Sequence, residues 1–582
     1  MSRPGSTTAD IAVGWRILDL FIAARQRIGG VSGRFGGLML LLPALCLVTI
    51  LTAGIVLLAW RSFHVFDPFL FKQGDLSTAN YRQVFETTLM REVFVRTVMM
   101  ALVTTTIAVT VALPTAYLMT RLRSRVLRVL ILVAIFIPIL TGDIARAYGW
   151  LVLLGREGLV SWVTEQVGLG TPQLLGTLWA VGIGTVQILI PLSVVILLPA
   201  FQRVDGQLEQ AAATLGAGPV RVWTRVILPL VRPGIAGAAA VCITVSMTEF
   251  ANPGLLGQGV RDYVANLVQN VVLGRDNVYL GSAIGLSLLV VVMVLVTTVL
   301  VVSQRSRGAV APPGTGGSGP TRISPAMWAI TAATVLYLTL PTLIIIASSF
   351  SAGEQIAFPP TGFTLDWYAD MLKSGTVWDT LRNSLYVGLV SVVVTVVVAV
   401  PAMLAVHRRR VRGGTYVTAY LSIGLATPFI VSAIAFLIVF TELGVLRHLT
   451  AVAIAIAIVN LPFMLWAVAS SILDHGTDLE KAAATLGAEE VQQFIFVTVP
   501  AVAPGVITGG LMVFVLGITE FVVSAILVNL NNLTLPVFVY SGIRTTVSPF
   551  LAAVAVLFIA VAACVLSLVI RFGRIEQFLY RR

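Results

Sequence analysis

A ten-residue polar stretch occurs twice in this chain, and each copy lies between long apolar runs. The first copy reads LEQAAATLGA at 208–217, and the second reads LEKAAATLGA at 479–488. The residues that follow also recur 271 positions apart: Pro229 and Pro500, Pro233-Gly234 and Pro504-Gly505, and Thr248-Glu249-Phe250 and Thr519-Glu520-Phe521. The chain therefore contains two tandem copies of one unit. An alanine-rich helix that ends at a glycine, with a proline beyond it, predicts a short helix lying on something outside the bilayer.

The apolar runs decide the broad class of the protein. Of its 582 residues, 57% are hydrophobic and 11% are charged, whereas a soluble domain carries about a quarter charged residues. Several runs reach the roughly 20 residues that a spanning helix needs, and they do not alternate as barrel strands do. We therefore expect an all-α integral membrane protein. Its twelve predicted spans lie at 38–60, 94–120, 126–153, 174–200, 233–252, 280–303, 326–349, 381–406, 414–441, 449–471, 504–529 and 549–570.

The net charge of +12 does not indicate a nucleic-acid partner. Most of the Lys and Arg residues lie at the ends of apolar runs, as the positive-inside rule expects for a membrane protein. The two alanine-rich loops, 203–232 and 474–503, fall on the same side as these basic clusters. This pattern predicts that both loops and both termini are cytoplasmic.

The repeat gives the expected domain organisation. A first half, 38–303, and a second half, 324–582, each contain six spans, so the halves share one orientation and are related by a pseudo-twofold axis along the membrane normal. A Gly-, Pro- and Ser-rich segment, 304–323, predicts a flexible cytoplasmic linker. The leader, 1–37, is either an amphipathic surface helix or a solvated segment. Equivalent residues of the two halves are 287 positions apart upstream of the alanine-rich loops and 271 apart from the loops onward. The first half therefore has 16 extra residues, which we expect near 154–173.

The motifs of an enzyme are missing from the sequence. It contains no GxxxxGK[ST], HExxH or GxSxG pattern, so we expect no catalytic residue and no nucleotide site in this chain. Its four histidines are scattered, and its three cysteines lie inside apolar runs without metal-ligand spacing. We therefore expect no metal site and no resident cofactor.

Charged residues inside the predicted spans are candidates for function, because carboxylates are costly in lipid. Glu249 and Glu520 each lie on a fifth span, where they either line a solute path or have a structural role, capping a helix end or pairing with an Arg on a neighbour. Asp143 and Arg146 are three residues apart, on one helix face, and can pair with each other. If the three carboxylates face a pore, that pore suits a cation.

Two segments outside the membrane contain aromatic residues at matching places in the halves. The segments 80–85 and 366–371 predict short amphipathic helices on the outer face. They either dock a partner or anchor their loops at the lipid interface.

The paired loops resemble the EAA loops of permease subunits in ATP-binding-cassette (ABC) importers. That pattern is E-A-A, three residues, Gly, nine residues, and I-x-L-P. The first copy matches at Ala211, Ala212 and Gly216, and the second at Ala482, Ala483 and Gly487. Both copies depart from it, because Gln210 and Lys481 stand where the pattern has Glu, and Glu209 and Glu480 come one residue earlier. The identity of the key acidic contact stays open.

The resemblance implies that each loop forms a coupling helix that docks on a cytoplasmic ATPase. Two copies of that ATPase would bind ATP and Mg, and an extracytoplasmic binding protein would deliver the solute to one fused permease in the bacterial inner membrane. The implied ATPase-coupling residues are Glu209, Gln210, Ala211, Ala212, Gly216, Trp223, Pro229, Glu480, Lys481, Ala482, Ala483, Gly487, Phe494 and Pro500.

Each half also resembles one type of spermidine/putrescine permease. The first half is similar to the B-type through Ile137-Pro138, the segment 146–150 and the segment 253–257, and the second half to the C-type through 348–350 and 359–368. The resemblance implies the type I importer fold and a polyamine solute. Ferric iron, thiamine and 2-aminoethylphosphonate permeases belong to the same wider group. The residues expected along the solute path are Asp143, Arg146, Tyr148, Trp150, Glu249 and Glu520. An ion-coupled secondary transporter is the alternative from a different class.

Overall fold

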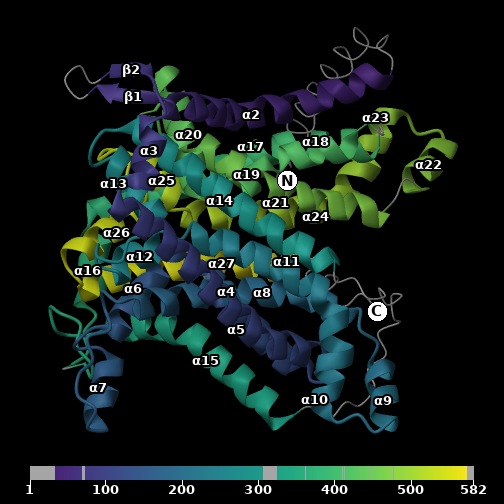
Figure 1. Ribbon diagram of the computed structural model, residues 1–582. Coiled ribbons are helices and arrows are strands. Elements are labelled where there is room, and N and C mark those ends of the chain that lie inside the picture. The colour runs from purple at the N-terminus through teal and green to yellow at the C-terminus, as the bar shows by residue number, and fades with distance from the viewer. Residues whose placement is uncertain are drawn as a thin grey trace, which may run out of the picture.

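The computed structural model is a bundle of long helices that lie side by side (Figure 1). It describes residues 33–67, 72–305, 324–360, 362–408, 411, 413–446, 448–475 and 478–572. Within these ranges, nine helices are long and apolar enough to cross a membrane, or ten if one bent pair counts as a span. The predicted all-α membrane fold is confirmed. The leader up to residue 32 and the linker from 306 to 323 lie outside the described residues.

The first half begins with a long helix and a small hairpin and ends with another long helix. Its elements are α2 (Gly33–Ser62), β1 (His64–Asp67), β2 (Lys72–Leu76), α3 (Ala79–Glu86), α4 (Thr88–Arg121), α5 (Arg125–Leu140), α6 (Asp143–Leu154), α7 (Leu159–Gln166), α8 (Leu178–Gln202), α9 (Gly206–Thr214), α10 (Pro219–Val222), the π-helical turn η1 (Trp223–Ile227), α11 (Leu228–Met247), α12 (Ala251–Leu256), α13 (Val264–Val272) and α14 (Val278–Arg305).

The second half repeats this order without the hairpin and without a counterpart of α7 among the described elements. Its elements are α15 (Pro325–Ser348), α16 (Asp366–Lys373), α17 (Gly375–His407), α18 (Gly414–Leu421), α19 (Ile423–Ala426), α20 (Phe429–Glu442), α21 (Leu449–His475), α22 (Asp478–Thr485), α23 (Glu490–Gln493), η2 (Phe494–Thr498), α24 (Val499–Thr519), α25 (Val522–Leu527), α26 (Leu535–Thr545) and α27 (Pro549–Phe572). Helix α7 lies where the 16 extra residues are predicted.

The third predicted span of each half is broken, which corrects the single spans expected at 126–153 and 414–441. In the first half, Gly142 adopts a φ of 72° between α5 and α6, and the two helical segments meet at 96°. In the second half, Thr427 is extended because Pro428 follows it, and the helix restarts as α20. Each break therefore has a local cause, a left-handed glycine in one half and a proline in the other.

The fifth predicted span of each half is also interrupted, at the repeated Thr-Glu-Phe triplet. Helix α11 ends at Met247 and the short α12 follows it, and α24 ends at Thr519 before the short α25. The expected spans at 233–252 and 504–529 are therefore each two helices. The carboxylate of each triplet lies at the break.

The first span of each half packs against the other half. Helix α2 contacts α20 and α17, while α15 contacts α6, α4 and α5. At the first crossing, a Cβ on Gly54 would lie 2.7 Å from the carbonyl oxygen of Ala435, and at the second a Cβ on Gly149 would lie 2.7 Å from that of Pro341. Glycine permits both approaches. The two halves are thus interlocked.

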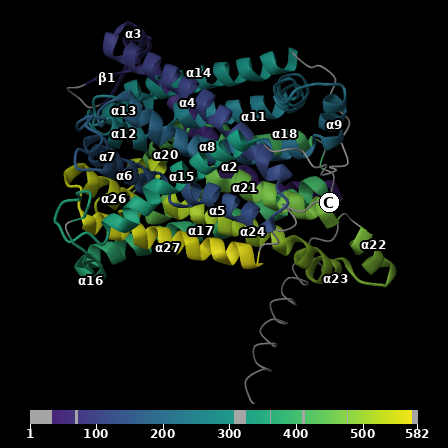
Figure 2. The same ribbon diagram turned by 90° about the horizontal axis from the view of Figure 1, so that it is seen from below.

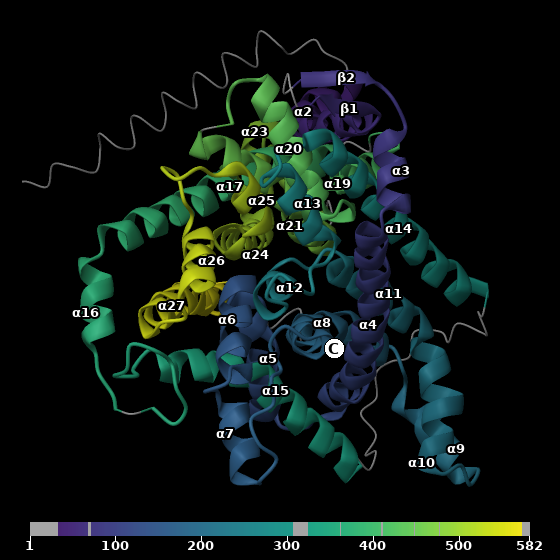
Figure 3. The same cartoon turned by 60° about the vertical axis from the view of Figure 1, so that its left-hand side comes forward.

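The bundle has two distinct ends. Helices α9 and α10 of the first alanine-rich loop and α22 and α23 of the second lie at one end (Figures 1 and 2). The short helices α3 and α16 lie at the opposite end, and an end-on view places them on opposite sides of that face (Figure 3). The predicted short helices in the segments 80–85 and 366–371 are therefore present.

Candidate functional site

The first alanine-rich loop is a helix, a left-handed glycine and a second helix. The Asp205 carboxylate accepts a hydrogen bond from the Gln207 backbone N–H, 2.9 Å away, and so caps α9. Gly216 has a φ of +80°, and no atom beyond its two chain neighbours lies within 4 Å of the place of a Cβ. In the second loop, Gly487 has a φ of +86° and equally open surroundings. Both loops therefore turn through the same conformation, which favours glycine.

Glu209 points into the protein and not away from it. Its carboxylate pairs with Arg121 at the end of α4, 2.5 Å away, and accepts a hydrogen bond from the Tyr117 hydroxyl at 2.6 Å. The side chains of Arg121 and Glu209 are 7% and 5% exposed. This acidic residue of the first motif is therefore buried against its own half.

Glu480 occupies the matching place in the second loop. It pairs with Arg408 at the end of α17 and accepts a hydrogen bond from the Thr498 hydroxyl. The side chains of Arg408 and Glu480 are 13% and 19% exposed, so this pair is more accessible than the first. In both loops the acidic residue contacts the helical bundle of its own chain.

The outward face of each loop carries the residue types that the resemblance assigns to coupling. Gln210 and Ala211 are exposed in the first loop, as are Lys481 and Ala482 in the second, while Ala212 and Ala483 are half-buried. Sequence reasoning missed the residues just before the glycines: Leu215 and Leu486, both 88% exposed. An apolar residue at the tip of a polar segment, in both copies, was the available signal.

The aromatic residues at the far end of the loops have different surroundings. Trp223 lies against the rings of Tyr117 and Phe201, with centroids 5.1 Å and 6.3 Å apart. Phe494, its counterpart, is 45% exposed. Both begin a π-helical turn, η1 or η2, that leads into the next span. Pro229 and Pro500, both exposed, stand in the first turn of α11 and α24.

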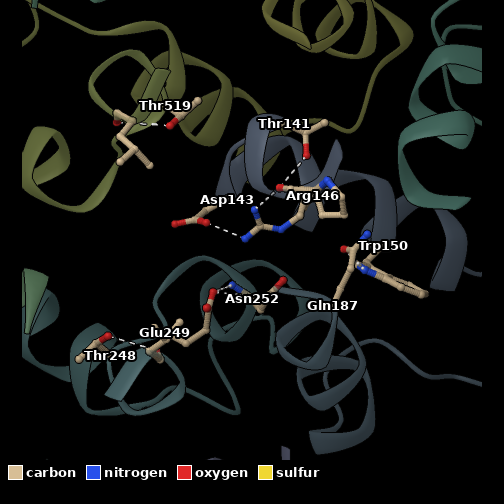
Figure 4. A network of polar contacts seen from close by, with 12 residues as sticks. Thr141, Asp143, Arg146, Trp150, Gln187, Thr248, Glu249, Asn252 and Thr519 are labelled. Carbon is tan, nitrogen blue, oxygen red and sulfur yellow. Dashed lines mark hydrogen bonds and ion pairs between the residues drawn. The ribbon is translucent and has the colours of Figure 1, made fainter. Parts of the chain in front are cut away.

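A second group of polar residues lies where the halves meet, far from the loops. The Arg146 guanidinium is buried and donates hydrogen bonds to the Asp143 carboxylate at 2.6 Å and the Pro138 carbonyl at 2.7 Å (Figure 4). The Asp143 side chain is 47% exposed. It lines a small cleft between the halves together with Thr519 of α24, Val539 of α26 and Phe558 of α27. The predicted Asp143–Arg146 pair is present.

Glu249 and Glu520 each accept hydrogen bonds from the first turn of a short helix. Glu249 accepts from the backbone and side-chain amides of Asn252, at 3.3 Å and 3.1 Å. Glu520 accepts from the backbone N–H groups of Val523 and Ser524, at 2.7 Å and 3.0 Å. These contacts fit the helix-capping alternative. Glu249 is also within electrostatic reach of Asp143 and Arg146, and Glu520 of Asp143, so the three carboxylates lie near one another, with Asp143 common to both interactions.

Aromatic rings close the space between the two triplets. Phe250 and Phe521 meet with centroids 5.4 Å apart, and Tyr540 lies 4.7 Å from Phe521. Both phenylalanines are buried. The breaks in the fifth spans of the two halves therefore face each other across an aromatic contact beside the carboxylates.

Two other residues expected along the solute path make contacts between the halves. The Tyr148 hydroxyl donates to the carbonyl of Ser548 in the second half, 2.8 Å away. The Trp150 indole donates to Gln187 at 2.7 Å and packs on Tyr337 of α15. Both are buried. Within the described ranges, no group of three or more His, Cys, Asp and Glu residues is arranged to hold a metal ion.

Comparison with known proteins shows the family to which this chain belongs. The family model described as "Binding-protein-dependent transport system inner membrane component" matches twice, at 105–307 and 375–582. The chain is 30% identical over 256 residues to the inner membrane ABC transporter permease protein YdcU of Escherichia coli, covering 40% of this chain and 81% of that protein. It is 29% identical to the spermidine/putrescine permease PotB of Haemophilus influenzae, covering 41% and 89%, and 28% identical to PotC of Escherichia coli, covering 39% and 85%.

The duplicated match corresponds to the two interlocked halves. About two fifths of this chain covers most of the length of each of these relatives, and the family model matches this chain twice. The chain belongs to the family of binding-protein-dependent transport system inner membrane components, as a fused permease of a type I ABC importer.

Proposed function

We propose that two cytoplasmic ATPase subunits dock on the two alanine-rich loops and power import through this chain. Each loop presents an exposed leucine, Leu215 or Leu486, beside a left-handed glycine. A fully exposed leucine flanked by small residues suits insertion into an apolar groove of a partner. The basic clusters on the loop side support a cytoplasmic location for the loops and both termini. One fused permease per transporter would supply both docking sites.

The solute we propose is a small polyamine-like cation. The observation that carries this is that Glu249 and Glu520 both lie within electrostatic reach of Asp143, where the halves meet, while the Arg146 guanidinium is ion-paired with Asp143. Excess carboxylate charge in a low-dielectric path attracts cations and repels anions. The neighbouring rings of Phe250 and Phe521 add faces that favour ammonium groups. The similarity to PotB and PotC, which are spermidine/putrescine permeases, supports the same class.

A solute-binding protein would dock at the opposite end, across α3 and α16. These helices lie on opposite sides of that face (Figure 3), so one partner that spans both would cover the entrance between the halves. Phe85 of α3 and Leu372 of α16 are exposed there, which supports an apolar contribution to the contact.

Uptake into proteoliposomes tests the solute class. The full chain with its own ATPase and binding protein is expected to import labelled spermidine or putrescine. Asp143→Asn and Glu520→Gln should each reduce that uptake by about tenfold, because each removes a carboxylate from the path. Glu165→Gln, a change at an exposed carboxylate of α7, is the matched control. Import of 2-aminoethylphosphonate, ferric iron or thiamine, without polyamine import, would reassign the solute.

Docking is tested by co-purification of the ATPase with variants of both loops. Leu215→Asp together with Leu486→Asp should abolish the complex, because an aspartate cannot be buried unpaired in an apolar groove. Unchanged binding would remove the loops as the docking site. Uptake that needs an ion gradient and no ATP would favour the secondary-transporter alternative.

A further inference from the structure

The two alanine-rich helices are each bonded to the second long helix of their own half. Arg121 closes α4 and pairs with Glu209 of α9, and Arg408 follows α17 and pairs with Glu480 of α22. The two arginines are 287 residues apart and the two glutamates 271, so each pair joins repeat-equivalent positions. We call them the loop–helix ion pairs.

The other contacts of these carboxylates differ between the halves. Tyr117 donates to Glu209, but the equivalent residue in the second half is Leu404, which cannot donate. Thr498 donates to Glu480, but its equivalent in the first half is Ile227. Of these side-chain contacts, only the Arg–Glu pair is common to both loops.

Stability alone does not account for a buried ion pair. Removing two charges from water costs several kcal/mol per ion, and apolar residues of similar volume often stabilise as well or better. What an ion pair provides is a fixed orientation, because the guanidinium and carboxylate meet in a defined geometry. The presence of the pair in both copies therefore points to positioning of the loop.

We infer that the loop–helix ion pairs make each alanine-rich helix and the adjoining end of α4 or α17 move as one body. Motion of a docked ATPase then reaches α4 and α17 directly, as well as α11 and α24, which follow the loops in the chain. Helix α4 contacts α8, α11 and α15, and α17 contacts α21, α24 and α2. The four residues are positioning residues, and this role rests on the proposed docking of ATPases on the loops.

Charge exchange in the first half tests the inference. Arg121→Glu and Glu209→Arg should each reduce polyamine uptake by about tenfold or more, while ATP hydrolysis by the bound ATPase continues, so that the ATP used per solute rises. The double variant Arg121→Glu/Glu209→Arg should restore uptake to within about threefold of the wild type, because the pair is re-formed.

A matched control is the Arg61–Glu442 ion pair, which joins α2 to α20 without touching either loop. Its charge-reversed variants should leave the ATP used per solute unchanged. Hydrogen exchange of amides 206–214, measured on the chain alone in lipid nanodiscs, gives a second readout. Exchange should be faster in Arg121→Glu and return toward the wild-type rate in the double variant.

The outcomes separate the two proposals. A wild-type chain that binds no ATPase would overturn the proposed docking, whatever the ion pairs do. Normal ATP use per solute in the single variants of a coupled transporter would overturn the positioning role alone. Loss of uptake in both single variants without recovery in the double variant, together with unchanged amide exchange, would also overturn it.

Discussion

The two alanine-rich loops have the same backbone conformation, but the first is buried more deeply against its half than the second. In the first, the Arg121–Glu209 pair is almost fully covered and Trp223 packs against Tyr117 and Phe201. In the second, the Arg408–Glu480 pair is more accessible and Phe494 is largely uncovered. The outward leucine and the left-handed glycine are alike in both. The outward features are therefore shared, while the first loop is packed more deeply against the membrane domain.

The largest expected difference between the loops comes from removing the arginines. Arg121→Ala leaves Glu209 buried without its cation and should lower the free energy of unfolding by about 3–5 kcal/mol. Arg408→Ala leaves a more solvated carboxylate and should cost about 1.5–3 kcal/mol. Thermal unfolding of each variant in detergent, followed by tryptophan fluorescence, measures the order. Equal losses would show that the difference in burial has no energetic weight.

Truncating the aromatic residues should give the next largest difference. Trp223→Ala removes the packing against two rings and should cost about 2–3 kcal/mol, whereas Phe494→Ala should cost about 1 kcal/mol or less. The same unfolding measurement applies, with Phe496→Ala, at another exposed ring in η2, as a control. A larger loss for Phe494 than for Trp223 would reverse the comparison.

The smallest expected effect is equal in the two loops. Gly216→Ala and Gly487→Ala place a Cβ on a left-handed residue in open surroundings. Each change should raise the free energy of that backbone conformation by about 1 kcal/mol. ATPase affinity, measured by titration onto the chain in nanodiscs, should therefore fall about fivefold for either variant if the turn is needed for docking. Unequal losses would show that the ATPase subunits engage the loops differently.

Much of the fold could be predicted because local sequence patterns specify it. The 271-residue repeat identified the two loops, and hydropathy located the long helices. The breaks in the third and fifth spans were not predicted, because Gly142, Pro428 and the repeated triplets sit inside apolar runs whose average hydropathy hides them. A left-handed glycine in the middle of such a run becomes visible only through its backbone angle.

The contacts of the candidate sites were harder to predict than their residues. Glu209 was recognised as part of a motif, but its partner Arg121 lies 88 residues away, and only the folded loop brings the two together. Likewise, the hydrogen bonds of Tyr148 to the Ser548 carbonyl between α26 and α27, and of Trp150 to Gln187 of α8, join distant segments. Pairings between distant segments depend on packing that no local pattern encodes.

The π-helical turns η1 and η2 determine how each loop is rotated about the axis of the span that follows it. Each contains one residue more than the same length of α-helix, and every residue turns a helix by about 100°. Deleting a single residue within 223–227 would restore ordinary winding and rotate the outward leucine by more than a quarter of a revolution. The direction in which the leucine points therefore depends on the number of residues in each turn. Insertion or deletion of one residue there should be far less tolerated than beside Gly168 or Gly170, which have open space around them.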